Sequence, residues 1–295
     1  MSSASIVNPL LELRHVTRRF GGLVAVNDLT MSVMGGTIHG LIGPNGAGKS
    51  TAFDLISGLV SVSGGEVILG GRTISGMPAE ARVAAGICRT FQTPRLFERM
   101  SVLDTVRTGR HLHGSVGVFG SMFSLVRKRR EEREIAATAA QFLDIVGLSE
   151  EAEAPVGDLS YGKRRLVEIA RALATEPKLL LLDEVTSGLN PIETAAVGNL
   201  IEQLARGGLT IVLVEHDMKF VMRLCERITV LNFGSRIAEG TPDEVARDEA
   251  VIAAYLGRRE EGRTPRRDLR GSARGRPADQ RRTTRGDMHG KGAAG

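Results

Sequence analysis

The segment GPNGAGKST (43–51) most constrains the fold, because it fits the spacing GxxxxGK[ST] and lies between an apolar run and a helix signal. The apolar run TIHGLIG (37–43) is expected to form a buried strand, and STAFDLISGL (50–59) the following helix. Glycines at such a turn let successive backbone N–H groups point at phosphate oxygens. We expect Lys49 to reach the β- and γ-phosphates and Ser50 to ligate Mg²⁺. The segment therefore predicts a strand–loop–helix unit that binds a nucleoside triphosphate.

A second apolar run ends in two acids. The leucines at 179–182 predict a buried strand, and Asp183 follows at its carboxyl end, where α/β folds place ligands. The Asp183 carboxylate can hold Mg²⁺ through water at that point, and Glu184 can polarise the water that attacks a γ-phosphate. Together with the phosphate-binding loop, these acids predict hydrolysis of the bound triphosphate.

Strand and helix signals alternate through residues 10–257, which predicts an α/β fold. The expected strands lie at 10–20, 24–33, 37–43, 66–71, 86–91, 178–185, 209–216 and 226–232, and the expected helices at 49–58 and 191–206. The later strands are near-continuous apolar runs, which are typical of a parallel sheet covered on both faces. The first two indicate an antiparallel meander. We expect an α/β core that carries an antiparallel flap and an inserted, mostly helical arm.

The helical arm is expected at 101–140, where strand character is weakest and helical periodicity is best. Within it, the apolar VFGSMFSL (118–125) precedes the charged RKRREER (127–133). We interpret this segment as a helix packed in a helical subdomain. A helix that lies on a membrane surface is the alternative.

The positive charge is concentrated at the C-terminus. The 295 residues carry a formal net charge of +5, but residues 258–295 contain twelve Lys+Arg and five Asp+Glu, which leaves −2 for the rest. Leu269 and Met288 are the only large apolar residues in this segment, so it is expected to be a disordered basic tail. We favour a solvated extension over a nucleic-acid or lipid-binding role, and we expect no nucleic-acid partner.

The remaining bulk features predict a cytoplasmic protein. The chain contains no run of 18 apolar residues, and MSSASIVNPL lacks the pattern of a signal peptide. Cys88 and Cys225 have no CxxC spacing, so both are expected to be buried thiols in a reducing compartment.

The segment LSYGKRR (159–165) is a second candidate anion site. A glycine turn with a serine that opens a helix is suited to meet an anion, although an ordinary capped helix is the alternative. A second such turn, more than a hundred residues from the first, implies either a second ligand or a second subunit.

In chain order, the motifs resemble the ATP-binding subunit of an ABC transporter. They are GPNGAGKST, Phe91 with Gln92, LSYGKRR, LLLLDE and Glu215 with His216, and the resemblance covers residues 10–257. Further segments resemble one subtype, the larger of the two ATPase subunits in bacterial branched-chain amino-acid importers. These segments are RTFQTPRLF, the insert after residue 110, TSGLNP, VEHDMKFVM and the ending GTPDEV…VIAAYLG.

The resemblance implies a P-loop NTPase (RecA-like) core with an antiparallel β subdomain and a helical signature subdomain at about 92–175, after an N-terminal extension at 1–9. It also implies that two ATPase subunits stack head to tail, so that each LSYGK turn closes on the ATP held by the other subunit. One chain then carries two half-sites and is inactive alone.

The resemblance assigns roles to single residues. Gln92, Glu184 and His216 are catalytic, and Mg²⁺ is held by Ser50, Gln92 and Asp183. The nucleotide-binding residues are Phe20, Gly43, Pro44, Asn45, Gly46, Ala47, Gly48, Lys49, Ser50 and Thr51. Phe20 is the candidate for stacking on adenine, although an ordinary core phenylalanine is nearly as good an interpretation. The signature residues that face the opposite subunit's ATP are Leu159, Ser160, Tyr161, Gly162 and Lys163.

Four positions depart from the commonest family pattern. Val185 replaces a proline after the catalytic glutamate, and Asn190 stands where many relatives have aspartate. Tyr161 and Lys163 replace glycine and glutamine of the signature. Asn190 and Tyr161 are usual in the branched-chain subtype, whereas Lys163 adds a charge near the opposing phosphates.

The implied function is ATP hydrolysis, with ATP and Mg²⁺ as cofactors, that drives uptake of branched-chain or related amino acids. The implied partners are two transmembrane permease subunits, a paralogous ATPase subunit or a second copy, and indirectly an extracytoplasmic substrate-binding protein. The chain would lie peripherally at the cytoplasmic face of the inner membrane. Alternatives are an importer for urea or amides, a soluble ABC-type ATPase that acts on nucleic acid, and a nucleotide sensor that does not hydrolyse ATP. The presence of Lys49, Asp183, Glu184 and His216 argues against the last.

Overall fold

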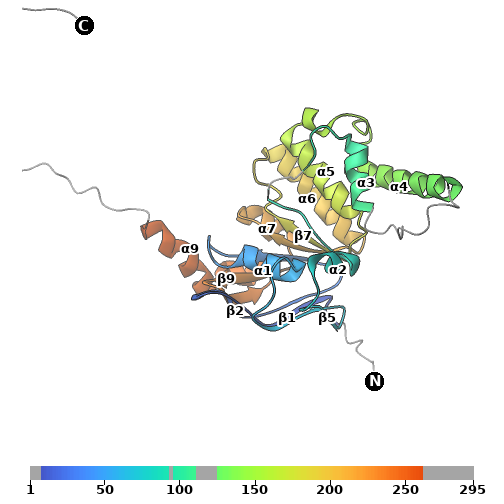
Figure 1. Ribbon diagram of the computed structural model, residues 1–295. Coiled ribbons are helices and arrows are strands. Elements are labelled where there is room, and N and C mark those ends of the chain that lie inside the picture. The colour runs from blue at the N-terminus through green and yellow to red at the C-terminus, as the bar shows by residue number, and fades with distance from the viewer. Residues whose placement is uncertain (1–7, 93–95, 111–124, 262–295) are drawn as a thin grey trace, which may run out of the picture.

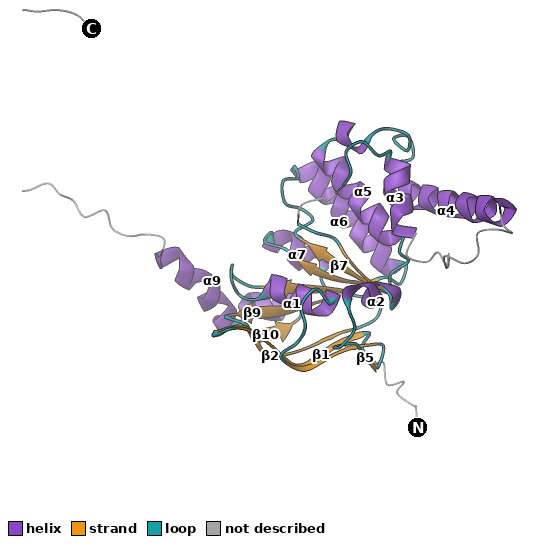
Figure 2. Cartoon of the chain, viewed as in Figure 1, coloured by secondary structure: helices purple, strands orange, loops and turns teal. Residues whose placement is uncertain are grey.

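The computed structural model describes residues 8–92, 96–110 and 125–261, which form two β-sheets and a set of covering helices (Figures 1 and 2). The larger sheet has the order β10-β9-β3-β8-β7-β6. Its strands are β3 (Ile38–Ile42), β6 (Ile87–Arg89), β7 (Leu179–Asp183), β8 (Thr210–Val214), β9 (Arg227–Asn232) and β10 (Ser235–Gly240). All pair in parallel except β10, which is antiparallel to β9. The expected α/β core is confirmed.

The smaller sheet is the expected antiparallel flap. It has the order β2-β1-β4-β5, with β1 (Leu11–Phe20), β2 (Leu23–Val33), β4 (Gly64–Leu69) and β5 (Arg72–Thr73). Each neighbouring pair is antiparallel. Gly21 and Gly22 make the turn between β1 and β2, and Gly21 has a φ of 56°, a conformation that favours glycine.

The described helices complete the fold. They are α1 (Lys49–Ser57), α2 (Ala79–Ala84), α3 (Val102–Arg110), α4 (Leu125–Ile145), the 3₁₀ turn η2 (Val156–Asp158), α5 (Tyr161–Leu173), α6 (Pro191–Arg206), α7 (Met218–Leu224), α8 (Pro242–Arg247) and α9 (Glu249–Glu261). Figure 1 shows α3, α4 and α5 gathered to one side of the larger sheet, with α4 projecting outward. Helix α3 lies within the helical arm expected at 101–140, α4 continues five residues past it, and α5 lies outside it.

Strand β7 shows why a central strand of this sheet is a nearly continuous apolar run. Leu179 and Leu181 belong to one hydrophobic cluster, which also holds residues of α1 and of the antiparallel sheet. Leu180 and Leu182 belong to a second cluster, with residues of α5, α6 and α7. Because both faces of the sheet are covered, the interior positions of β7 are leucines, and its one polar residue, Asp183, stands at the strand end.

Several sequence-based expectations fall at or beyond the limits of the described residues. Residues 118–124 of the apolar segment and most of the expected tail (262–295) lie outside them. Helix α9 continues to Glu261, four residues past the point at which we expected the domain to end.

None of the helices within the described ranges is long and apolar enough to cross a membrane. Cys225 is buried as expected, whereas Cys88 is only half-buried.

A buried histidine on the strand that leads into the phosphate-binding loop makes stability depend on pH. His39 of β3 is 1% exposed, and its Nε2 lies 2.8 Å from Thr229 Oγ1 of β9. Burial, together with the charge of Arg227, lowers the pKa of His39 to about 4. The unfolded chain, with a pKa near 6.5, binds the proton more readily. The contribution of neutral His39 to the free energy of unfolding is therefore fully present above pH 6.5 and is lost as the pH falls towards 4.

We predict that His39 alone costs the fold up to about 3 kcal/mol on acidification. The measurement is urea unfolding of the wild type and of His39→Gln between pH 7.5 and 4.5. The wild type is expected to lose about 2 to 3 kcal/mol more than the variant over this range. Equal losses in the two proteins would show that burial does not lower the pKa of His39 below its value in the unfolded chain.

Candidate functional site

The phosphate-binding loop lies between β3 and α1 with the backbone that its glycines require. Gly43, Gly46 and Gly48 have φ values of 150°, 79° and 103°. A Cβ at Gly43 would overlap the carbonyl oxygen of Leu231 in β9, so any other residue there would push the neighbouring strand away. Lys49 is 6% exposed, and its Nζ donates to the carbonyl oxygens of Gly43 at 2.7 Å and Pro44 at 3.1 Å. The lysine ammonium therefore lies inside the curve of the loop.

The loop opens into a cavity of about 520 Å³. Six predicted nucleotide-binding residues line it, together with two predicted catalytic residues: Asn45, Gly46, Gly48, Lys49, Ser50, Thr51, Glu184 and His216. The antiparallel sheet and the β9–β10 turn supply the remaining wall, namely Leu23, Val24, Ala25, Phe233 and Gly234. Gly43, Pro44 and Ala47 belong to the loop without lining this cavity. The cavity is large enough for a nucleotide and has an apolar side and a cationic side.

Phe20, the predicted adenine-stacking residue, lies at the end of β1 near this wall. It is 45% exposed, and the Arg18 guanidinium lies 4.5 Å from its ring centroid. Phe20 is not among the residues that line the cavity in the described part of the chain, whereas Phe233, which is 79% exposed, is. The role of Phe20 therefore stays a prediction, and Phe233 is a second aromatic ring at the mouth of the cavity.

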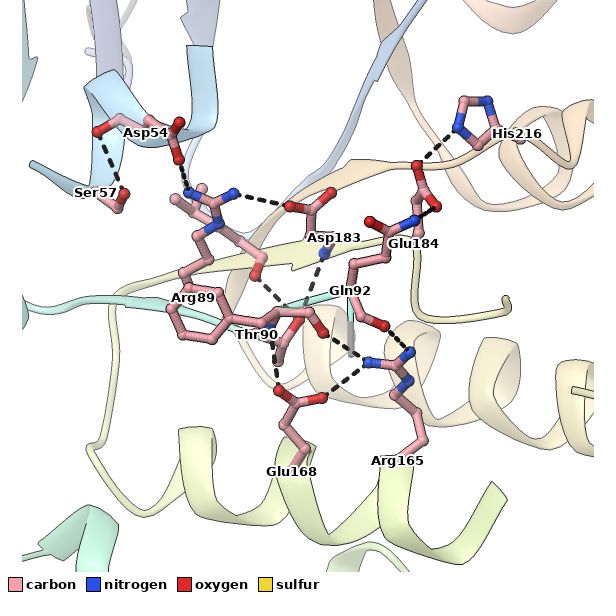
Figure 3. A network of polar contacts seen from close by, with 12 residues as sticks. Asp54, Ser57, Arg89, Thr90, Gln92, Arg165, Glu168, Asp183, Glu184 and His216 are labelled. Carbon is pink, nitrogen blue, oxygen red and sulfur yellow. Dashed lines mark hydrogen bonds and ion pairs between the residues drawn. The ribbon is translucent and has the colours of Figure 1, made fainter. Parts of the chain in front are cut away.

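Asp183 is held by an arginine that sequence reasoning missed. Arg89, on the neighbouring strand β6, donates from Nη2 to Asp183 at 2.8 Å and from Nη1 to Asp54 of α1 at 2.5 Å (Figure 3). Its side chain is 9% exposed and that of Asp183 10%, so this ion pair is largely shielded from water, whereas Asp54 is 33% exposed. Arg89 thus ties the end of β7 to the helix that follows the phosphate-binding loop.

The three predicted catalytic side chains meet at Glu184. Gln92 Nε2 donates to Glu184 Oε2 at 2.5 Å, and His216 Nε2 lies 2.7 Å from Glu184 Oε1 (Figure 3). Glu184 has a φ of 49°, which is unusual for a residue other than glycine. Its N–H donates to the carbonyl of Val214, so the last hydrogen bond of the sheet fixes this backbone. Residues that are 92 and 32 positions from Glu184 in the chain therefore converge on one carboxylate.

Glu215 joins the turn after Glu184 to the main chain of His216. Its carboxylate accepts hydrogen bonds from the N–H and hydroxyl of Thr186, each at 2.8 Å, and from the His216 N–H at 3.3 Å. Burial raises the pKa of Glu215, against the effect of these hydrogen bonds. Val185 is fully buried between Glu184 and Thr186. The turn that lacks the usual proline is thus held by a buried apolar side chain and by Glu215.

The predicted signature residues lie elsewhere. Ser160 caps α5 by accepting from the Lys163 N–H at 3.3 Å. Gly162 packs against the Glu193 carboxylate of α6, and Lys163 forms an ion pair with Glu151. Leu159 is 8% exposed and Tyr161 is 42% exposed. None of the residues 159–163 lines the nucleotide cavity of the same chain within the described residues.

Comparisons with known proteins identify the family of the chain. The family model described as ABC transporter matches residues 26–187, and the model described as branched-chain amino acid ATP-binding cassette transporter matches residues 235–261. The chain is 41% identical over 250 residues to the high-affinity branched-chain amino acid transport ATP-binding protein BraF of Pseudomonas aeruginosa. It is 40% identical over the same length to LivG of Escherichia coli K12, which has the same description. Both alignments cover 84% of this chain and 98% of the relative.

The fold also matches a solved structure. The crystal structure of the ADP conformation of MJ1267, an ATP-binding cassette of an ABC transporter, superposes with a TM-score of 0.75 at 30% identity, covering 84% of this chain and 99% of that chain. The chain therefore belongs to the ABC transporter family, as an ATP-hydrolysing, ATP-binding subunit of the branched-chain amino acid type.

Proposed function

We propose that this chain couples ATP hydrolysis to the uptake of branched-chain or related amino acids by an ABC importer. The observation that carries the proposal is the convergence of Gln92 and His216 on Glu184, at the edge of a cavity lined by Lys49. The 41% identity to BraF, a branched-chain amino acid transport protein, supports the class of cargo.

Hydrolysis in this proposal depends on positioning and charge. Glu184 orients the attacking water and accepts its proton, while Gln92 and His216 hold the carboxylate at hydrogen-bonding distance. On binding, the nucleotide phosphates replace the carbonyl oxygens of Gly43 and Pro44 as partners of the Lys49 ammonium. Fixed donors around the γ-phosphate stabilise the charge that spreads over its oxygens in the transition state.

The proposed Mg²⁺ ligands are Ser50, Gln92 and Asp183. Hydroxyl, amide and carboxylate oxygens are a suitable set, because Mg²⁺ uses one or two protein carboxylates and completes its shell with phosphate oxygens and water. The described residues contain no cluster of three or more His, Cys, Asp or Glu that could hold a metal by itself. A magnesium site here is therefore built jointly with the nucleotide. The ion supplies charge neutralisation at the β- and γ-phosphates when bound.

The signature turn is proposed to act on a second subunit. Ser160 and Gly162 lie at the N-terminus of α5, where backbone N–H groups and the helix dipole attract anions, but they do not line the cavity of their own chain. We therefore assign them to the γ-phosphate of an opposing ATPase subunit, either a paralogue or a second copy.

The segment after Gln92 is proposed to contact the two transmembrane permease subunits. Residues 93–95 lie outside the described residues, and the next ones include Phe97, which is 71% exposed. A cavity of about 320 Å³ lies between α2, β6, α3 and α5 and includes Phe91 and Cys88 in its lining. A coupling helix of the permease is proposed to dock here, at the cytoplasmic face of the membrane, while an extracytoplasmic binding protein delivers the cargo.

The test is uptake in cells that lack this chain. Deletion is expected to abolish uptake of radiolabelled leucine, isoleucine and valine, and the wild-type gene is expected to restore it whereas Lys49→Ala is not. Unchanged uptake of these amino acids, with loss of urea or short-amide uptake, would support the alternative importer. Unchanged uptake of all of them, with altered binding of nucleic acid, would contradict the importer proposal altogether.

A further inference from the structure

Helix α5 carries a buried ion pair that does not contact the nucleotide cavity. Arg165 and Glu168 are 0% and 1% exposed, and Arg165 Nη1 donates to Glu168 Oε2 at 2.9 Å. The residues are three positions apart, so they lie on the same side of the helix. Removing two charges from water carries a large cost, which has to be offset by well-formed hydrogen bonds to other groups. The identity of those groups indicates what the pair does.

The partners of this pair are the main-chain atoms on either side of Gln92. Arg165 donates from Nη1 to the Phe91 carbonyl at 2.7 Å and from Nη2 to the Gln92 carbonyl at 2.5 Å (Figure 3). Glu168 Oε1 accepts from the Phe91 N–H at 3.1 Å. Three hydrogen bonds thus fix the main chain of two consecutive residues, Phe91 and Gln92, to one helix. The planar guanidinium can span two carbonyls at once, which a lysine ammonium cannot do in the same way.

The same arginine also contacts the signature turn. Arg165 Nη2 donates to the Tyr161 hydroxyl at 3.1 Å, and the guanidinium lies 5.7 Å from the centroid of the Tyr161 ring. Tyr161 directly follows Ser160, the cap of α5. The side chain of Gln92, in turn, donates to Glu184. A continuous series of contacts therefore runs from the signature turn through Arg165 to the main chain of Gln92, and from its side chain to Glu184.

We propose that Arg165 and Glu168 are positioning residues that make the placement of Gln92 at Glu184 depend on the position of helix α5. When the signature turn binds a nucleotide on the opposing subunit, helix α5 is displaced. The ion pair then moves the main chain of Gln92 together with the helix. When α5 moves away, it withdraws Gln92 from the site of hydrolysis. This inference rests on the proposed catalytic role of Gln92 and Glu184.

The first test compares ATP hydrolysis by the assembled transporter carrying Arg165→Lys with that of the wild type. Lysine keeps the positive charge, but it lacks the planar guanidinium that donates to the Phe91 and Gln92 carbonyls at the same time. We expect kcat to fall about ten- to a hundredfold, the range for displaced supporting groups. ATP affinity of the isolated chain is expected to change less than about twofold, because Arg165 lies outside the nucleotide cavity. A wild-type kcat, or a loss of ATP affinity equal to the loss of kcat, would overturn the proposal.

The second test separates positioning from general support of the fold. If Arg165 acts through Gln92, Arg165→Lys has little further effect on kcat in a Gln92→Ala background. Effects that multiply in the double variant would contradict the proposal. Arg82→Lys is the matched control, because Arg82 is a second arginine, 1% exposed, that donates to main-chain carbonyls, here those of Ser75, Leu55, Ile56 and Met77. It is expected to lower the unfolding temperature but to show no coupling to Gln92→Ala.

If Arg165→Lys does not fold, Glu168→Gln takes its place, because it keeps the shape and an acceptor for the Phe91 N–H while removing the charge. Its effect on kcat is then compared in the wild type and in the Gln92→Ala background. Failure of the proposed function is distinguishable, because Gln92→Ala and Glu184→Gln alone would then leave hydrolysis unchanged. In that case, a substitution of Arg165 could not change the rate of hydrolysis through Gln92. Loss of hydrolysis in Gln92→Ala with no coupling to Arg165 would instead contradict only the present inference.

Discussion

Replacing Glu184 with glutamine is expected to reduce ATP hydrolysis by at least about a hundredfold while leaving ATP binding intact, because a neutral amide cannot accept a proton from the attacking water. The substitution keeps the side-chain shape, so Gln92 and His216 retain a partner at the distances of 2.5 and 2.7 Å seen for the acid. Lys49 and the phosphate-binding loop are unaffected. The ATP-loaded assembly should therefore accumulate in its closed state.

Phosphate release by the purified transporter and binding of a fluorescent ATP analogue measure the two expectations separately. Glu80→Gln, the same change at an exposed glutamate in the first turn of α2, serves as the matched control and should behave as wild type. Near wild-type hydrolysis by Glu184→Gln would show that another group acts as the base. Loss of ATP affinity in that variant would instead indicate a role for Glu184 in binding.

Gly162→Asp is expected to reduce the rate of ATP hydrolysis at least about a hundredfold without weakening the binding of ATP to the isolated chain. Gly162 lies in the first turn of α5, and a side chain there would collide with the Glu193 carboxylate and place a negative charge beside the predicted site of an opposing γ-phosphate. The nucleotide cavity of the same chain contains no residue of this turn within the described residues. Binding and hydrolysis should therefore separate.

Lys49→Ala is the comparison for this prediction, because Lys49 lies in the phosphate-binding loop and its loss should remove both ATP binding and hydrolysis. ATP affinity and phosphate release measured on both variants give the result. If Gly162→Asp weakens ATP binding by the isolated chain as much as Lys49→Ala does, the signature turn serves its own nucleotide. In that case the two-subunit interpretation is wrong.

The parts of the site that could be predicted from the sequence are those whose residues are neighbours in the chain. The phosphate-binding loop and the acids after β7 are continuous segments, and their chemistry follows from glycine, lysine and carboxylate at fixed spacing. The apolar strands are also evident locally, because strands of a sheet covered on both faces are near-continuous apolar runs. The bounds of these strands agree with the expected ranges to within a few residues.

The supporting residues could not be predicted in the same way. Arg165 lies within the run KRR, where a charged residue is normally solvated, and its burial depends on packing against a segment 73 positions away. Arg89 pairs with Asp183 from 94 positions away. Phe233 reaches the nucleotide cavity only because β9 pairs with β3. Such contacts are set by strand order and helix packing, and no local spacing encodes them.

The central claim is that one ATP is held between two polypeptides, with the phosphate loop of one and the signature turn of the other on the same γ-phosphate. The most direct measurement is a cryo-EM structure of the assembled transporter carrying Glu184→Gln, determined with ATP and Mg²⁺. We expect Ser160 Oγ at hydrogen-bonding distance, about 3 Å, from a γ-phosphate oxygen of the nucleotide bound to the opposing subunit. A closed, ATP-loaded complex in which Ser160 contacts no triphosphate would contradict this account.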